Sequence, residues 1–241
     1  MSDRATRSRS FETIAAEYER NRPEYPEEAL RWAADRIGLE RPARVLDIGA
    51  GTGKLTRGLV ALGFEVVAVE PGAPMLWQLR TAVPEAETFE GSAESIPLPD
   101  ESVEAAFAGQ AYHWFDRERA VPELHRVVRT GLALLWNWWD ERDPLQKELG
   151  ELVGYVGHEP YSEEELPAAP WFREVGRTVV ETVMDSSPDA LVGYLGTTSR
   201  YVVADAEERE QDLAEVHAVA SRYGERFALP RLTYVFAFAA L

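Results

Sequence analysis

Three glycines alternate with other residues directly after a short apolar run, in the segment from Asp47 to Gly53, which reads Asp-Ile-Gly-Ala-Gly-Thr-Gly. Glycine is needed where the main chain turns sharply or comes very close to a ligand. A helix that begins just after such a turn offers unpaired N–H groups to that ligand. We therefore expect this segment to contact a cofactor.

The spacing of the glycines distinguishes two classes of cofactor. A dinucleotide fingerprint reads G-x-G-x-x-G, so its third glycine comes three residues after the second. Counted from Gly49 this position holds Lys54, and counted from Gly51 it holds Thr56. The spacing argues against a nicotinamide oxidoreductase, which nevertheless stays open as an alternative.

Glu70 is a second residue placed to do chemistry. It follows the predicted strand 65–69 and lies about 20 residues after the glycine segment, where an acid can accept hydrogen bonds from the ribose hydroxyls of an adenosine. A surface glutamate that merely ends a strand is the other interpretation. Because nicotinamide enzymes carry an acid at the same place, Glu70 distinguishes cofactors less well than the glycines do.

The segment from Asp47 to Gly53 resembles the first motif of class I methyltransferases that depend on S-adenosylmethionine (SAM), although a generic glycine-rich turn is the alternative. The resemblance implies an α/β fold with a Rossmann-like, doubly wound and mostly parallel sheet of seven strands. It also implies SAM as cofactor and S-adenosylhomocysteine as product. The residues it places against the cofactor in this part of the chain are Asp47, Gly49, Ala50, Gly51, Gly53, Glu70, Pro71 and Met75.

The segment 91–100 resembles the family segment that lies at the edge of the adenine. Ser92 stands where an aspartate is frequent, and its hydroxyl can still accept a hydrogen bond from the adenine amino group. Ala93 is expected to contribute its backbone, and Glu94 is a second candidate acid. A solvated loop is the alternative interpretation of this segment.

The segment 107–116 follows the fourth predicted strand and is expected to face the transferred methyl group. It resembles the Ala-x-His-Trp-Phe-Asp segment of small-molecule methyltransferases of type 11, related to the trans-aconitate methyltransferase group. Gln110 and His113 are the candidate catalytic residues, and Gln110 is also a candidate cofactor contact. His113 is either a general base or a residue that orients the backbone or packs beside Trp114. A hydroxyl acceptor usually needs a base, whereas a carboxylate or an amine does not.

The segment 18–26 resembles the helical cover of the same subfamily, as does Leu229-Pro230 before the last predicted strand. Arg22 is expected to pair with the methionyl carboxylate of SAM, with Tyr18 closing over it, unless Arg22 is an exposed turn residue. The residues predicted to line the substrate pocket are Tyr25, Tyr112, His113, Trp114, Trp136 and Asn137. For the tryptophans, core packing is the alternative.

The residues around these segments predict strands that alternate with helices, which is typical of a parallel sheet. The predicted strands are 43–48, 65–69, 87–90, 103–108 and 132–138, and the helices between them are 54–62, 74–83 and 117–128. Later we predict a helix over 144–154, a loop or lid over 158–172, a strand over 177–184, a helix over 206–222 and a strand over 231–238. A helical region over 11–39 is broken at 22–26 by two prolines.

We expect one methyltransferase domain over 1–241, with a helical cover over 1–40, a SAM-binding core over 41–140, and lid segments with the last strands over 141–241.

The net charge of −17 disfavours a nucleic acid partner and favours a small molecule. The chain has no cysteine, and no apolar run approaches the ~20 residues of a membrane span, which fits a cytoplasmic protein with no membrane partner. Histidine spacing predicts no metal site. The sequence does not indicate the oligomeric state.

These observations predict a methyltransferase that moves a methyl group from SAM to a small-molecule acceptor, with O-methylation of a carboxylate or a hydroxyl expected. A SAM-binding protein without catalysis, acting as a sensor or a partner of another protein, is the alternative outside enzymes.

Overall fold

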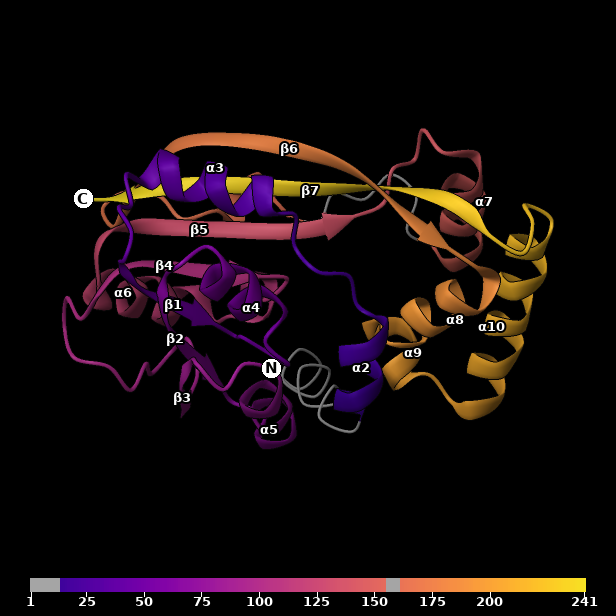
Figure 1. Ribbon diagram of the computed structural model, residues 1–241, viewed down its shortest axis with the longest axis horizontal. Coiled ribbons are helices and arrows are strands. Elements are labelled where there is room, and N and C mark those ends of the chain that lie inside the picture. The colour runs from indigo at the N-terminus through magenta and orange to yellow at the C-terminus, as the bar shows by residue number, and fades with distance from the viewer. Residues whose placement is uncertain (1–13, 155–160) are drawn as a thin grey trace. The chain divides into compact units, whose positions relative to one another are not determined.

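Seven strands form one sheet in the order β3-β2-β1-β4-β5-β7-β6 in the computed structural model, which describes residues 14–154 and 161–241 (Figure 1). The strands are β1 (Arg44–Ile48), β2 (Glu65–Glu70), β3 (Glu87–Glu90), β4 (Val103–Gly109), β5 (Val128–Trp138), β6 (Phe172–Ser186) and β7 (Phe227–Ala240). The pairs β1–β2, β1–β4, β2–β3 and β4–β5 are parallel, whereas β7 runs opposite to β5. The predicted mostly parallel sheet of seven strands is confirmed.

The strand order reverses at β1, which lies between β2 and β4. The parallel register places Ile48 beside Val69 and Asp47 beside Phe107. The loops that follow these strands therefore leave the sheet at the same edge. In open α/β sheets this edge, at the point where the strand order reverses, is where ligands bind.

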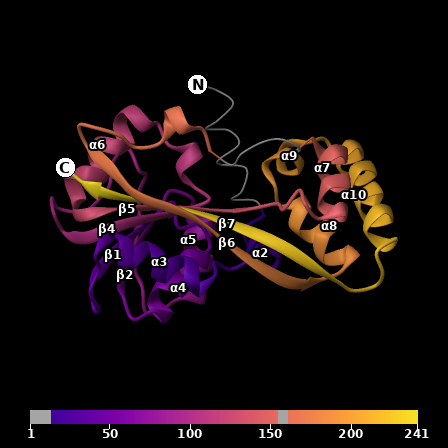
Figure 2. The same cartoon turned by 90° about the horizontal axis from the view of Figure 1, so that it is seen from above.

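Alternate side chains of β1 enter two different hydrophobic clusters. Leu46 and Ile48 pack on the face covered by α6 (Arg117–Val127), and Val45 packs on the face covered by α3 (Glu27–Ile37) and α4 (Lys54–Ala61) (Figure 2). A strand that is buried on both faces needs apolar residues in succession, which is the pattern that predicted it. A further helix, α5 (Ala73–Ala82), follows β2 and contacts β2 and β3.

The chain divides into two compact units. The core unit comprises 23–137, 161–180 and 233–241, and the helical unit comprises 1–22, 138–160 and 181–232. The helices of the helical unit are α2 (Ala15–Asn21), α7 (Pro144–Val153), α8 (Pro188–Gly196), α9 (Ser199–Val203) and α10 (Ala206–Ser221). We propose that both units belong to one methyltransferase domain, because β6 and β7 each contribute residues to both. The predicted cover 1–40 is divided between them, since α2 lies in the helical unit and α3 in the core unit.

The observed elements agree closely with the predicted ones up to β4, and they differ more after it. Three strands are longer than predicted, because β5 begins at Val128, β6 at Phe172 and β7 at Phe227. The helices α8 and α9 were not predicted, although the Ser187 side chain caps α8 by accepting from the Ala190 N–H, a signal readable in the sequence. Residues 11–13 of the first predicted helix and 158–160 of the predicted loop lie outside the described residues.

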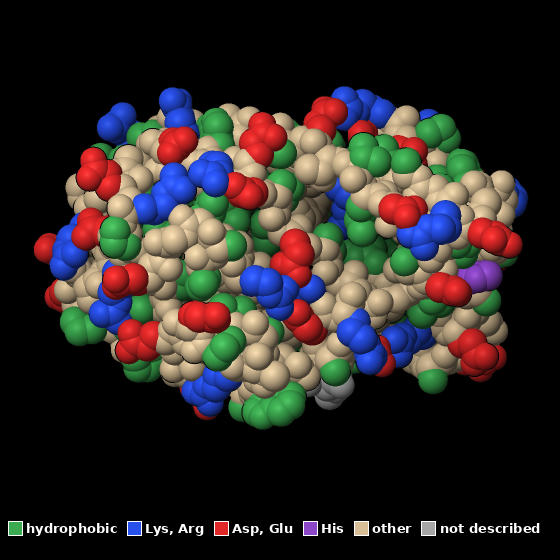
Figure 3. Space-filling model, in the orientation of Figure 1, with side chains coloured by type: hydrophobic (Ala, Val, Ile, Leu, Met, Phe, Trp, Pro, Cys, Tyr) green, Lys and Arg blue, Asp and Glu red, His purple; other side chains and the backbone are tan. Residues whose placement is uncertain are grey.

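Charged side chains of both signs are interspersed over the face of the molecule drawn in Figure 3. In the described parts of the chain, no helix combines the length and the apolar character needed to cross a bilayer.

The contact between β5 and β7 leaves no room for a side chain at Gly131, because a Cβ there would lie 2.1 Å from the carbonyl oxygen of Phe238. We expect Gly131→Ala to lower the free energy of unfolding by roughly 1–3 kcal/mol, measured by urea denaturation. The control is Gly58→Ala in α4, where the Cβ would meet only the end of the Leu30 side chain and helix propensity improves. Equal stability of wild type and Gly131→Ala would contradict this packing.

Candidate functional site

The glycine segment folds back over the carboxyl ends of β1 and β2. Gly49, Gly51 and Gly53 have φ values of 68°, 57° and 92°, in the left-handed region that glycine adopts at little cost. The N–H groups of Gly49 and Ala50 both donate to the carbonyl oxygen of Val69, at 2.9 and 3.2 Å. Apart from residue 51 and its two chain neighbours, no atom of the described residues lies within 4 Å of the place that a Cβ of residue 51 would take. The loop therefore presents main chain beside open space.

The carboxylate of Glu70 holds two loops at once. Its Oε2 accepts a hydrogen bond from the Gly51 N–H at 2.9 Å, and its Oε1 accepts from the Gly72 N–H at 2.9 Å. The side chain is 9% exposed and lies at the end of β2, as predicted. A carboxylate at this place provides the acceptor that ribose hydroxyls require. Of the other predicted cofactor residues here, Pro71 is exposed and Met75 is buried in α5.

Asp47 lies beneath the glycine segment rather than at its surface. Its side chain is fully buried, and its Oδ2 accepts a hydrogen bond from the Thr56 hydroxyl at 2.6 Å. Burial raises the pKa of the Asp47 carboxyl to about 7; the nearby charge of Glu70 adds to this effect, and the Thr56 hydrogen bond opposes it. The contact joins β1 to α4, and the predicted contact of Asp47 with the cofactor stays a prediction.

The segment that follows β3 makes a tight turn. The Gly91 N–H donates to the carbonyl oxygen of Glu70 at 3.3 Å, and Ser92 pairs with Ser95 across the turn. Ala93 is buried, whereas Ser92 and Glu94 are half-buried. Glu94 accepts a hydrogen bond from the Asp116 N–H at 2.8 Å, which joins this segment to the start of α6.

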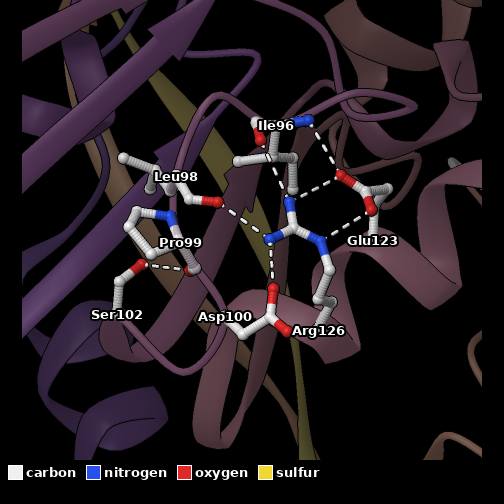
Figure 4. Close-up of polar contacts among 7 residues, drawn as sticks. All are labelled: Ile96, Leu98, Pro99, Asp100, Ser102, Glu123 and Arg126. Carbon is white, nitrogen blue, oxygen red and sulfur yellow. Dashed lines mark hydrogen bonds and ion pairs between the residues drawn. The ribbon is translucent and has the colours of Figure 1, made fainter.

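Arg126, near the end of α6, holds the same segment from outside, and sequence reasoning did not identify it (Figure 4). Its guanidinium donates to the carbonyl oxygens of Ile96 and Leu98, at 3.0 and 2.8 Å, and to the carboxylate of Asp100 at 2.8 Å. Its partner Glu123 accepts two further bonds from it, which hold the pKa of the Glu123 carboxyl below its usual range. The spacing of Glu123 and Arg126 indicated only an ordinary pair on a helix surface.

Gln110 follows β4 with a φ of 55°, which is uncommon for a residue that has a side chain. Its N–H donates to the carbonyl oxygen of Leu135 at 2.8 Å, and its side-chain oxygen accepts from the Asn137 N–H at 2.9 Å. These two bonds to β5 hold the strained conformation, which costs on the order of 1–3 kcal/mol. The structure therefore fixes Gln110 at the carboxyl edge of the sheet.

His113 is half-buried in the 3₁₀ turn that follows Gln110, and its ring centroid lies 4.7 Å from that of Trp114. Trp136 Nε1 donates to His113 Nδ1 at 3.3 Å. An indole nitrogen only donates, so Nδ1 is the acceptor and a neutral ring carries its proton on Nε2. In this tautomer His113 presents a donor at Nε2 rather than a base.

The predicted substrate-pocket residues differ in exposure. Trp136 is 1% exposed and belongs to the hydrophobic core, which matches the packing interpretation of this tryptophan. Tyr112 is also buried, and its hydroxyl donates to the carbonyl oxygen of Glu165 at 3.0 Å. The Asn137 side chain donates to the Glu24 carbonyl oxygen at 3.3 Å and accepts from the Thr233 hydroxyl at 2.7 Å. Tyr25, His113 and Trp114 are half-buried.

Tyr18 and Arg22 belong to the helical unit. The Arg22 guanidinium donates to the carbonyl oxygen of Thr197 at 2.7 Å and lies 5.0 Å from the centre of the Tyr18 ring. The predicted contacts of both residues with the cofactor stay predictions.

No group of three or more His, Cys, Asp or Glu placed to hold a metal ion occurs in the described ranges 14–154 and 161–241.

Comparisons with known proteins agree with this geometry. A family described as a methyltransferase domain matches residues 46–135. An uncharacterized methyltransferase of Mycobacterium tuberculosis is 41% identical over 233 residues, which cover 94% of this chain and 93% of the relative. A solved structure from Anaeromyxobacter dehalogenans, described as a type II methyltransferase, has a TM-score of 0.67 and 32% identity, and the match covers 91% of this chain and 97% of that one. A malonyl-[acyl-carrier protein] O-methyltransferase of Methylococcus capsulatus is 40% identical over 107 residues, 42% of this chain and 38% of the relative.

The raised pKa of Asp47 predicts a pH-dependent stability. Folding raises this pKa from 3.8 to about 7, so the associated stabilisation is complete below about pH 4 and is lost as the pH rises towards 7. Asn at this position resembles the protonated acid. We therefore compare the free energies of unfolding of Asp47→Asn and wild type, measured by urea titration at several pH values. We expect the value for Asp47→Asn minus that for wild type to rise by about 1 kcal/mol per pH unit between about pH 5 and 6.5. A difference that does not change with pH would contradict the assignment.

The Arg126 contacts predict a local effect on the segment after β3. We expect Arg126→Met to speed hydrogen exchange of the amides of Ile96, Leu98 and Asp100, because two carbonyl oxygens and two carboxylates lose a donor. Arg129→Met is the matched control, because among the described residues Arg129 pairs with Glu104 alone, at an exposed site. Equal exchange at 96–100 in the two variants would show that Arg126 does not hold this segment.

Proposed function

Since this chain belongs to the class I SAM-dependent methyltransferases, we propose that it transfers a methyl group from SAM to an oxygen atom of a small-molecule acceptor, with a carboxylate favoured over a hydroxyl. The single observation that carries the cofactor part is the Glu70 carboxylate bound to the Gly51 N–H at the carboxyl edge of the sheet.

The residues at this edge fit SAM by their chemistry. The glycine segment would hold the methionyl part, Glu70 the ribose, and Ser92, Ala93 and Glu94 the adenine. The open space beside Gly51 and the left-handed glycines allow the close approach of main chain that such a ligand needs. Bound SAM supplies a methyl group on a positively charged sulfur.

The chain's contribution to catalysis is then mainly positioning. Methyl transfer is an in-line displacement, and holding both reactants in a fixed geometry lowers the barrier without a chemical group from the protein. Gln110, held by two bonds to β5, is the residue that we propose to orient the reactants. It lies at the end of β4, directly beside β1 in the sheet.

The tautomer of His113 favours a carboxylate acceptor. A hydroxyl usually needs a base, and a His113 that accepts from Trp136 at Nδ1 offers none at Nε2. A carboxylate is already ionised at neutral pH and needs no base. The partial similarity to a protein named as a malonyl-[acyl-carrier protein] O-methyltransferase supports O-methylation as well.

Glu70→Gln tests the cofactor assignment. Because the substitution removes the charge and replaces one acceptor oxygen by a donor, we expect the Kd for S-adenosylhomocysteine to rise on the order of tenfold to a hundredfold in calorimetry. Glu65→Gln is the matched control, since Glu65 is the exposed acid at the other end of the same strand. Thermal unfolding of both variants checks that the fold is retained. Unchanged affinity in a folded Glu70→Gln protein would defeat the assignment.

The acceptor class is tested by turnover. The protein is incubated with SAM and a panel of small mono- and dicarboxylic acids and of alcohols, and S-adenosylhomocysteine formation is measured. We expect products only with the acids, and these products should release methanol in alkali because they are methyl esters. Alkali-stable products would indicate a hydroxyl acceptor and contradict the carboxylate. Tight binding of S-adenosylhomocysteine without turnover on any acceptor would indicate a SAM-binding protein without catalysis.

A further inference from the structure

Two arginines flank one buried tyrosine in the helical unit. The guanidinium of Arg231, on β7, lies 4.5 Å from the centre of the Tyr194 ring, and that of Arg22, at the end of α2, lies 5.0 Å from the same ring. Arg231 is 5% exposed and Tyr194 is 7% exposed. We call Arg22, Tyr194 and Arg231 the arginine–tyrosine cluster.

The positive charge of this cluster is not balanced by the residues that the structure describes. Within them neither Arg22 nor Arg231 forms an ion pair, although other arginines of the helical unit do, such as Arg200 with Asp212 and Arg226 with Asp185. Arg22 donates to the carbonyl oxygen of Thr197, which is a neutral acceptor.

Several donors of the cluster are buried without a partner. In the described parts of the chain, Nε and Nη2 of Arg231 and Nε of Arg22 have no hydrogen-bond acceptor. Burying a guanidinium without an acceptor or a counter-charge costs several kcal/mol. Such donors require an acceptor, which a bound ligand, an ion or a water molecule can provide.

The ionisation of Tyr194 reports the local field. Burial is the largest single influence on the hydroxyl and would raise its pKa, but the positive charges of Arg231 and Arg22 and their hydrogen bonds to it together outweigh burial, so this pKa lies below its ordinary value. An anion is therefore favoured at this place in a protein whose net charge is −17.

We propose that Arg22 and Arg231 bind the carboxylate of a small molecule beside Tyr194. A guanidinium offers a planar fork of donors that matches the two oxygens of a carboxylate. The carboxylate has two sources, which the experiment distinguishes: the methionyl part of SAM or the methyl acceptor. Only this choice of sources rests on the proposed function, since the site itself rests on the contacts of the helical unit.

The test uses malonate as probe and malonamide as its neutral analogue of the same shape. We expect malonate at millimolar concentration to raise the Tm of the wild-type protein and to give a measurable Kd in calorimetry, and malonamide to do neither. In Arg231→Met we expect the Kd for malonate to rise on the order of tenfold to a hundredfold. The control is Arg226→Met in the same unit, which removes an exposed and paired guanidinium and should leave the Kd unchanged.

The Tm without ligand separates binding from structure. Replacing a buried, unpaired charge by an apolar side chain is often neutral or stabilising, so Arg231→Met should keep or raise the Tm. If Arg231→Met does not fold, Arg231→Lys keeps the charge without the fork and should still weaken malonate binding about tenfold. Equal effects of malonate and malonamide, or an unchanged Kd for malonate in the folded variant, would overturn the proposal.

Two further ligands identify the source of the carboxylate. If the carboxylate belongs to SAM, Arg231→Met weakens the binding of S-adenosylhomocysteine but not that of 5′-methylthioadenosine, which lacks the carboxylate. In that case malonate also competes with S-adenosylhomocysteine for binding. If it belongs to the acceptor, both nucleosides bind Arg231→Met as they bind wild type, and malonate binds together with S-adenosylhomocysteine. Loss of malonate binding alone would leave the SAM assignment intact, whereas failure of S-adenosylhomocysteine to bind wild type would defeat that assignment and not the carboxylate site.

Discussion

The carboxylate of Glu70 accepts hydrogen bonds from Gly51 on one side and from Gly72 on the other, and the carboxyl edge of the sheet is organised around it. The parallel register of β1 and β2 brings the two loops close enough for one side chain to join them. A residue that binds main-chain N–H groups at the edge of the sheet is also a residue that can bind sugar hydroxyls there. The same carboxylate thus shapes the glycine segment and provides the acceptor that we propose for the ribose of the cofactor.

The other loops at this edge are each fixed by a polar group beneath or behind them. Asp47 joins β1 to α4 through Thr56, Arg126 holds the segment after β3, and the backbone of β5 holds Gln110. These contacts leave the loops little freedom before a ligand arrives. A preorganised site of this kind suits a reaction whose rate depends on positioning more than on proton transfer.

The helical unit has a different chemical character from the edge of the sheet. The edge offers main-chain donors and a carboxylate, which suit the nucleoside part of a cofactor. The helical unit contributes two guanidinium groups around Tyr194, which suit an anion. We propose that recognition of the reactants uses neutral main chain and one acid at the edge of the sheet, and two guanidinium cations in the helical unit, in a protein with a large negative net charge.

The sequence by itself determined the alternation of strands and helices in the first half of the chain, the glycine segment and the place of Glu70. These features depend on local periodicity and on spacing along one strand–turn–helix unit, which neighbouring residues control. Only the tertiary structure decided that Asp47 is enclosed, that Trp136 belongs to the core and fixes the tautomer of His113, and that Arg22 and Arg231 share one tyrosine. Those outcomes depend on residues distant in sequence, as in the bond between Arg22 and Thr197, 175 positions apart. Burial and charge balance arise only when such distant segments pack together, so no local pattern announces them.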